Sequence, residues 1–151
     1  MANLPEFNGE ELFDVPPERL FAAVTDLDTL ADAIPDLVSA ERPDARTLKC
    51  VVKPSFSFLK ATLRLTISLS DLQPPRAATL HIVGQGIGAA LEISSSLEIE
   101  PHDRGTRLTW HARIDRAGGL MATVPAGLMK GAADQVIRQG WRQVRERLAC
   151  Q

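Results

Sequence analysis

The sequence contains no tyrosine, and aromatic residues make up only 5% of its 151 residues. It also lacks an excess of basic residues, because 17 Lys and Arg stand against 19 Asp and Glu. A protein that binds nucleic acid usually needs such an excess to neutralise phosphates. No apolar run approaches the roughly 18 residues of a membrane-spanning helix. We therefore expect no nucleic-acid partner and no transmembrane segment.

Cysteine is scarce as well. Cys50 and Cys150 are too few for a disulfide framework or a structural zinc site. The first residues, Met1 to Asn8, lack the basic and apolar regions of a secretory signal. We therefore expect a cytoplasmic protein with reduced thiols, in which Cys50 is a small buried residue.

Hydrophobic residues make up 44% of the chain, which is enough for one substantial core. The length predicts a single domain that covers residues 1–151. Residues 11–15 alternate between polar and apolar side chains and predict a short opening strand. Two short helices should follow: one begins at Pro16-Pro17-Glu18, and the other is capped by Asp26 and ends at Pro35.

From about residue 37 to 115 the hydrophobic pattern has a period of two. Leu63, Leu65 and Ile67, for example, alternate with Arg64 and Thr66. This alternation is typical of antiparallel strands with one buried and one solvated face. The gaps at residues 73–76, 84–88 and 101–105 are short and turn-like, so they favour hairpins.

After Gly118-Gly119 apolar residues recur every three to four positions, which predicts one long helix that is kinked or starts late at Pro125. Three glycines, Gly127, Gly131 and Gly140, lie within it and each costs about 1 kcal/mol relative to alanine. Close packing on the sheet would explain them, and so would room for a ligand. The predicted class is α+β: an opening strand, two short helices, about six antiparallel strands and a long C-terminal helix.

This order of elements resembles the helix-grip fold of the START-like (SRPBCC) superfamily. The resemblance implies a curved antiparallel sheet of about seven strands wrapped on the long C-terminal helix, with a cavity between sheet and helix. Several blocks are similar to the CoxG family, named after the CoxG subunit of carbon monoxide dehydrogenase. The blocks are 7–9, 13–16, 20–21, Asp26, 30–35, 84–86, 105–110 and 118–122. One departure is Asp36, which stands where the family usually has glycine after Ile-Pro.

The resemblance implies a protein that holds a hydrophobic small molecule, such as a lipid or a quinone-like compound. It also implies an accessory role for a molybdenum hydroxylase of the carbon monoxide dehydrogenase type. Many family members continue into a tail thought to reach the membrane. This chain stops at Gln151, and we expect at most peripheral membrane contact.

The inward phase of the strands supplies the candidate ligand-binding residues. It is apolar except for two hydroxyls, Ser95 and Thr106, which either bond a neighbouring carbonyl or orient a ligand. Two phenylalanines follow a turn and could close or gate one end, and one isoleucine lies in the loop 84–88. The candidates are Phe56, Phe58, Leu65, Ile82, Ile87, Ser95, Leu97, Thr106, Trp110, Met121, Val124 and Leu128.

Catalytic signals are weak. His81 and His111 fall on the polar phase of their strands, and no inward pair of carboxylates is found. The glycines of segment 84–88 do not open a helix, so they predict a hairpin or bulge and not a phosphate loop. We therefore expect no catalytic residue, metal site or cofactor.

Two other functions remain open. The START-like resemblance allows a polyketide cyclase or dehydratase-like enzyme that uses Ser95 and Thr106. A domain with a filled core could instead act as a protein-interaction module through Trp141 or through the exposed arginines Arg138, Arg142 and Arg145.

Overall fold

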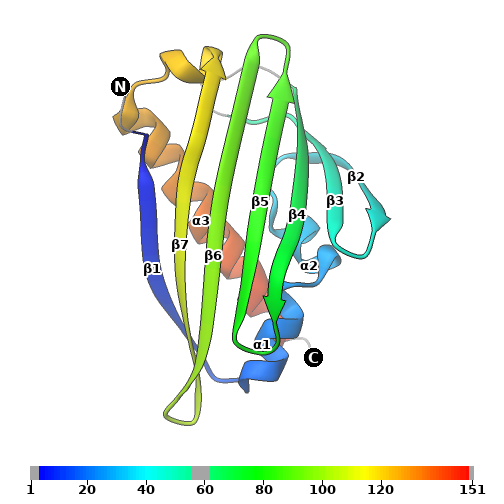
Figure 1. Ribbon diagram of the computed structural model, residues 1–151, viewed down its shortest axis with the longest axis vertical. Helices are drawn as coiled ribbons and strands as arrows, with labels where there is room; N and C mark the ends of the chain where they lie inside the picture. The colour runs from blue at the N-terminus through cyan, green and yellow to red at the C-terminus, as the bar shows by residue number, and fades with distance from the viewer. Residues whose placement is uncertain (1–3, 56–61, 150–151) are drawn as a thin grey trace.

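The computed structural model describes residues 4–55 and 62–149. Seven strands, three α-helices and one 3-10 helix follow one another in this part of the chain (Figure 1). In order they are β1 (Glu6–Phe13), α1 (Pro17–Val24), α2 (Leu27–Ala33), β2 (Leu37–Asp44), β3 (Thr47–Val52), β4 (Leu63–Gln73), β5 (Ala77–Gly86), β6 (Ala89–His102), β7 (Gly105–Gly119), η1 (Leu120–Thr123) and α3 (Ala126–Ala149).

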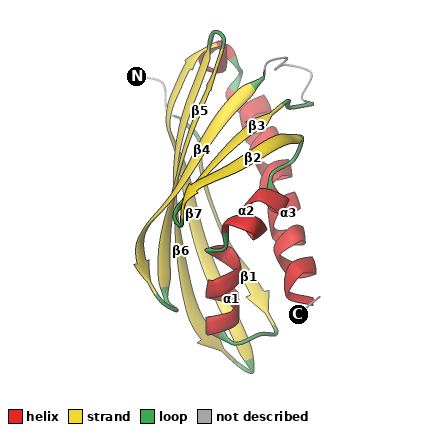
Figure 2. Ribbon diagram, turned by 90° about the vertical axis from the view of Figure 1, so that its right-hand side faces the viewer, coloured by secondary structure: helices red, strands yellow, loops and turns green. Residues whose placement is uncertain are grey.

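The strands form one antiparallel sheet in the order β1-β7-β6-β5-β4-β3-β2. The sheet curves, and α3 runs along its inner side while α1 and α2 lie beside the lower half of α3 (Figure 2). The predicted α+β helix-grip architecture is therefore confirmed. Short turns join β4 to β5, β5 to β6 and β6 to β7, as the turn-like gaps in the sequence predicted. Another short turn joins β2 to β3.

Both short helices begin where the sequence predicts. Pro17 opens α1, where its missing N–H is not needed. Asp26 caps α2 by accepting hydrogen bonds from the backbone N–H of Asp28 at 3.1 Å and from the hydroxyl of Thr29 at 3.2 Å. Thr29 is buried, so this cap also satisfies a hydroxyl inside the protein.

The opening strand was predicted too short and too late. β1 begins at Glu6 and ends at Phe13, and it pairs with β7 along its whole length. The alternation is hard to read at Asn8-Gly9, because Gly9 has no side chain of its own. Gly9 lies directly opposite Trp110 of β7, whose ring occupies the space that a side chain would need.

The long helix starts late. Pro125 precedes the first residue of α3, and the 3-10 turn η1 connects it to β7. Five polar contacts hold the C-terminal half of α3, and we call them the tethers. Arg145 donates to the carbonyl of Leu12 at 2.8 Å and to Glu11 at 3.1 Å. Arg147 donates to Asp32 at 2.6 Å and to Asp26 at 3.4 Å.

The fifth tether comes from α1, where Arg19 donates to the carbonyl of Leu148 at 3.1 Å. Among the described residues, no side-chain hydrogen bond joins residues 126–140 to another element. The helix is therefore fixed by polar contacts at its C-terminal end only.

Asp36, the departure from the family pattern, adopts a φ of 58°. This left-handed conformation favours glycine, and aspartate is one of the few other residues that tolerate it. Its carboxylate accepts hydrogen bonds from the backbone N–H of Ser55 at 3.1 Å and from the Ser55 hydroxyl at 3.2 Å. The side chain thus connects the start of β2 to the segment that follows β3.

Candidate functional site

The buried apolar residues form four separate clusters rather than one continuous core. The first surrounds α1 and the end of α3, the second lies under α2, the third lies near η1, and the fourth joins β1, β7 and the start of α3. A filled domain of this size usually has one contiguous core. Partly buried side chains, such as Leu80, Leu65 and Trp110, connect these clusters between sheet and helix.

Partly exposed side chains lie between these clusters, although they belong to the inward phase of β4 to β7. We call them the central lining: Leu65, Leu80, Ile82, Leu91, Ile93, Ser95, Trp110 and Ala112. Several of them border two clusters, as Leu80 and Trp110 do. The central lining is therefore apolar except for the Ser95 hydroxyl and the indole N–H of Trp110.

Gly140 faces this region from α3. It lies one turn from Val136 and from the buried Val144, on the inward stripe of the helix. A Cβ added at Gly140 would meet no atom within 4 Å. Open space therefore lies in front of this glycine, and close packing on the sheet does not explain it. We call the space between Gly140 and the central lining the interior gap.

The two inward hydroxyls have different surroundings. Thr106 is 1% exposed, and its hydroxyl donates to the carbonyl of Val15 at 2.5 Å. That bond fixes the segment between β1 and α1. Ser95 lies in mid-sheet between Leu80 and Ala112 and forms no side-chain hydrogen bond with the described residues. Of these two hydroxyls, that of Thr106 is therefore occupied within the protein, whereas that of Ser95 is not.

The other predicted site residues are distributed over the molecule. Leu65, Ile82 and Trp110 belong to the central lining together with Ser95. Leu97 is buried in the first cluster and Met121 in the third, while Val124 is half-buried against the fourth. Phe56 and Phe58 lie outside the described residues.

Ile87 and Leu128 do not face the interior gap, since they are 97% and 50% exposed. They belong to the β5–β6 turn and to the start of α3, which lie at the upper end of the molecule with η1 (Figure 1). Leu120 of η1 is 53% exposed. The backbone N–H of Leu120 donates to the carbonyl of Gly88 at 2.6 Å and ties η1 to the β5–β6 turn. Segments 82–91 and 117–129 contain no Asp, Glu, Lys or Arg. We call this end the uncharged tip.

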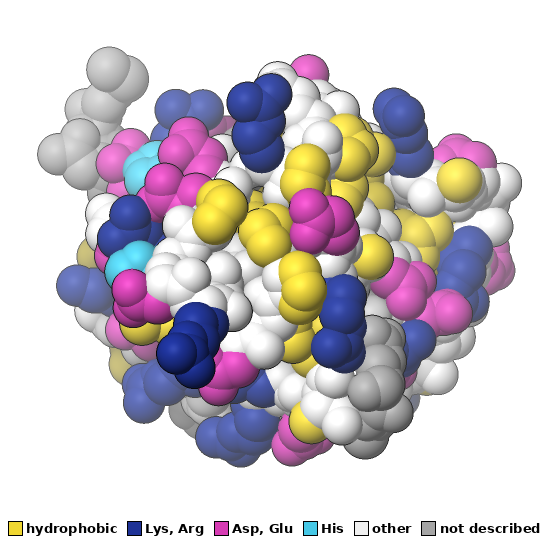
Figure 3. Space-filling view, turned by 90° about the horizontal axis from the view of Figure 1, so that it is seen from below, with side chains coloured by type: hydrophobic (Ala, Val, Ile, Leu, Met, Phe, Trp, Pro, Cys, Tyr) yellow, Lys and Arg dark blue, Asp and Glu magenta, His cyan; other side chains and the backbone are white. Residues whose placement is uncertain are grey.

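The opposite end of the molecule looks different. There, hydrophobic side chains are surrounded by charged side chains of both signs (Figure 3). A small hollow of about 520 Å³ lies at this end between the start of the β1–α1 connection and the β6–β7 turn. Leu12 and Phe13 line it together with Asp14, Asp103 and Arg104, so its wall mixes apolar and charged side chains.

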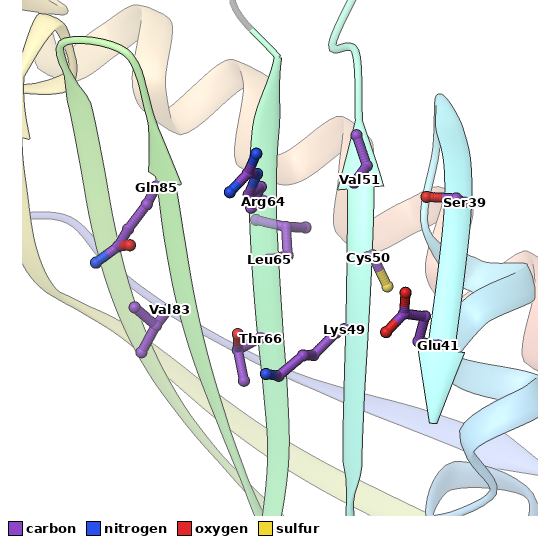
Figure 4. A pocket seen from close by; sticks show the side chains of 10 residues that line it. All are labelled: Ser39, Glu41, Lys49, Cys50, Val51, Arg64, Leu65, Thr66, Val83 and Gln85. Atoms are coloured by element: carbon purple, nitrogen blue, oxygen red, sulfur yellow. The ribbon is translucent and has the colours of Figure 1, made fainter. Parts of the chain in front are cut away.

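A larger hollow, of about 710 Å³, lies on the outer face of β2 to β5 and therefore outside the interior gap (Figure 4). We call it the outer hollow. Its residues are Ser39, Glu41, Lys49, Cys50, Val51, Arg64, Leu65, Thr66, Val83 and Gln85. Sequence reasoning treated the polar phase of these strands as a solvated face and missed the hollow. Two cationic residues on the polar phase of neighbouring strands, Lys49 and Arg64, could have indicated a charged site on this face.

The features proposed for an interaction module are partly engaged within the molecule. The guanidinium of Arg145 lies 4.3 Å from the centre of the Phe13 ring, and Trp141 is half-buried against the same ring at 6.1 Å. Within residues 4–55 and 62–149, no group of three or more metal-ligating side chains comes together. No helix of this part is long and apolar enough to cross a membrane.

Comparison with known proteins identifies the family. Residues 9–149 match the family model of CoxG, the G-type subunit of carbon monoxide dehydrogenase. The chain belongs to the CoxG family. No protein with a curated description matches the sequence. The match spans nearly the whole chain and so includes both the central lining and the uncharged tip.

Solved structures support the same fold. A conserved protein from Geobacillus kaustophilus is 20% identical with a TM-score of 0.87, and the alignment covers 96% of this chain and 95% of that one. Ara h 8.0201 is 17% identical with a TM-score of 0.70, covering 97% and 99%. The Mll3558 protein from Rhizobium loti is 16% identical with a TM-score of 0.67, covering 92% and 96%. At these identities the likeness shows the helix-grip fold alone.

Proposed function

We propose that this CoxG-family protein holds a hydrophobic small molecule, such as a lipid or a quinone-like compound, in the interior gap. The observation that carries the proposal is the open space in front of Gly140, opposite half-buried aliphatic side chains. Binding sites for small molecules are commonly apolar with a few placed polar groups. The Ser95 hydroxyl would be such a group, and it favours a ligand with one hydrogen-bonding oxygen.

The uncharged tip supplies a route for such a ligand. Ile87, Leu120 and Leu128 present aliphatic side chains to solvent at the end where the tethers of α3 are absent. An apolar molecule that contacts segments 82–91 and 117–129 meets no charged side chain belonging to them. We propose that the ligand enters here and that contact with a membrane, where it occurs, is peripheral and made by this end.

The decisive test compares two glycines in the same helix. Leucine at Gly140 would fill the interior gap, whereas leucine at Gly131, also free of atoms within 4 Å but on the exposed side of α3, would not. Native mass spectrometry before and after organic extraction, with added short-tailed quinone or decanoic acid, would measure occupancy. We expect Gly140→Leu to lose the extra mass and Gly131→Leu to keep it. Equal occupancy in both variants would contradict this site.

Membership of the CoxG family supports the second part of our proposal. This part is that the protein acts in the cytoplasm as an accessory factor of a molybdenum hydroxylase of the carbon monoxide dehydrogenase type. Its test is co-elution of the two purified proteins from the same organism in size-exclusion chromatography. Separate elution at micromolar concentrations of both proteins, with and without bound quinone, would contradict a stable complex.

A further inference from the structure

The outer hollow is built from two rows of side chains that cross four strands. Gln85, Arg64, Val51 and Ser39 are successive neighbours in one row, and Val83, Thr66, Lys49 and Glu41 form the other. Each row carries one cation and one valine, so cationic and apolar groups lie close together. Figure 4 shows these side chains on the face of the sheet that is turned away from α3.

The two cations of the outer hollow are not neutralised. Among the described residues, neither Lys49 nor Arg64 forms an ion pair. Elsewhere on the outer face, cations do have partners. Arg107 pairs with Glu100, and Arg113 pairs with Asp115. Lys49 and Arg64 therefore keep a positive charge, whereas Arg107 and Arg113 each share theirs with an acidic partner.

One carboxylate belongs to the same hollow. Glu41 lies opposite Lys49 in the pairing of β2 with β3, although no ion pair between them is formed. With two cationic side chains and one anionic side chain, the formal net charge of the lining is about +1. An anionic ligand would gain from Lys49 and Arg64 and would be repelled by Glu41.

We propose that the outer hollow is a second binding site, which takes an organic carboxylate with a flat apolar body. The planar guanidinium of Arg64 matches a carboxylate in geometry, and Lys49 adds a mobile positive charge. Val51 and Val83 offer apolar surface to the body, and Thr66 lies between Val83 and Lys49 as a hydrogen-bonding group. A volume of about 710 Å³ suits a small organic molecule.

Methyl NMR distinguishes this site from the interior gap, because Val51 and Val83 line only the outer hollow, whereas Leu80 and Ile93 belong only to the central lining. We would titrate the protein with 2-naphthoate and with its neutral analogue naphthalene-2-carboxamide. We expect saturable shifts of the Val51 and Val83 methyls with the carboxylate and at least tenfold weaker binding of the amide. If only the methyls of Leu80 and Ile93 shift, or if the amide binds equally well, the proposal is wrong.

Charge variants provide the second readout. Lys49→Gln combined with Arg64→Gln should weaken naphthoate binding at least tenfold. Arg116→Gln removes an exposed arginine of β7 outside the hollow and should change it less than twofold. Glu41→Gln should strengthen binding, because it removes the repelling carboxylate. Unchanged affinity in the Lys49 and Arg64 double variant, or weaker binding in Glu41→Gln, would overturn the site.

Discussion

The indole ring of Trp110 lies against Gly9 so closely that a Cβ at Gly9 would come within 2.8 Å of the ring. Alanine at this position therefore forces the ring or β1 to move. We expect Gly9→Ala to lower the free energy of unfolding by about 1–3 kcal/mol, as overpacking commonly does. Urea denaturation measures the change.

Gly118→Ala is the matched control, because its added Cβ would lie at an ordinary 3.5 Å from Ala90. It should be neutral or slightly stabilising. A second check uses Trp110→Leu, which should reduce the penalty of Gly9→Ala when the two are combined, since neighbouring substitutions couple. Full additivity would show that the ring is not the cause.

Trp110 also carries a buried indole N–H without a hydrogen-bond partner among the described residues. Replacing it with phenylalanine removes an unsatisfied donor and keeps most of the ring. We expect Trp110→Phe to change the free energy of unfolding by less than about 1 kcal/mol, far less than a typical loss of a buried hydrogen-bonded group. A loss of several kcal/mol would reveal a partner for this N–H.

Thr106 and Ser95 should separate stability from ligand binding. Thr106→Val leaves the carbonyl of Val15 without its donor, and we expect a loss of about 1–3 kcal/mol in stability. Ligand occupancy of the folded fraction should not change. Thr106→Ser keeps the hydroxyl and should lose less.

Ser95→Ala should do the reverse, with occupancy reduced several-fold and stability changed by less than about 0.5 kcal/mol, because no hydrogen bond of the protein is broken. Thermal denaturation and native mass spectrometry on the same samples provide both readouts. If Thr106→Val and Ser95→Ala reduced ligand occupancy equally, both hydroxyls would contact the ligand, as the enzyme alternative requires.

The Asp115 carboxylate should contribute to acid sensitivity. The hydrogen bond from the Ser94 hydroxyl, together with Arg113 and His81, holds the pKa of Asp115 below its ordinary value. A depressed pKa in the folded state adds stability above about pH 4 that is lost as the pH falls through the folded-state pKa. Asp115→Asn should therefore flatten the decline in unfolding free energy between about pH 5 and pH 3. If the unfolding free energy of Asp115→Asn declined with pH as steeply as that of the wild type, Asp115 would make no such contribution.

The thiol of Cys50 should react slowly in the folded protein. Burial raises the pKa of its thiol, and Arg42 opposes this only in part. Because the thiolate is the reactive form, a Cys150→Ser variant should react with a disulfide reagent at pH 8 far more slowly when folded than in urea. Rapid reaction in the folded state would show that the β3–β4 region opens readily.

The sequence predicted what depends on local pattern. The start of α1 at Pro17, the cap of α2 at Asp26, the alternation of β4 to β7 and the late start of α3 after Pro125 all follow from residue type and spacing. β1 was misjudged because Gly9 interrupts the alternation, and the reason is the ring of Trp110, which is distant in the sequence. No local pattern shows such a contact.

The candidate site was predictable in part. Alternation placed Leu65, Ile82, Ser95 and Trp110 on the inward face, but it could not tell which inward residues are packed and which border open space. Leu97 and Thr106 have the same phase as Ser95. Leu97, however, is packed in the first cluster, and the Thr106 hydroxyl bonds the carbonyl of Val15. Ile87 and Leu128 are exposed because turns and helix ends present side chains that periodicity does not assign to a face.

The tethers of α3 give the helix a gradient of stiffness along its length. Arg145, Arg147 and Arg19 anchor the end near Leu148, while residues 126–140 rely on apolar contacts and contain all three glycines of the helix. Amide hydrogens near Gly131 should therefore exchange with solvent faster than those near Val144. Among the described residues, no ion pair would break if the start of α3 moved away from the sheet at the uncharged tip. A ligand could then enter and leave there while the tethered end of α3 stays in place.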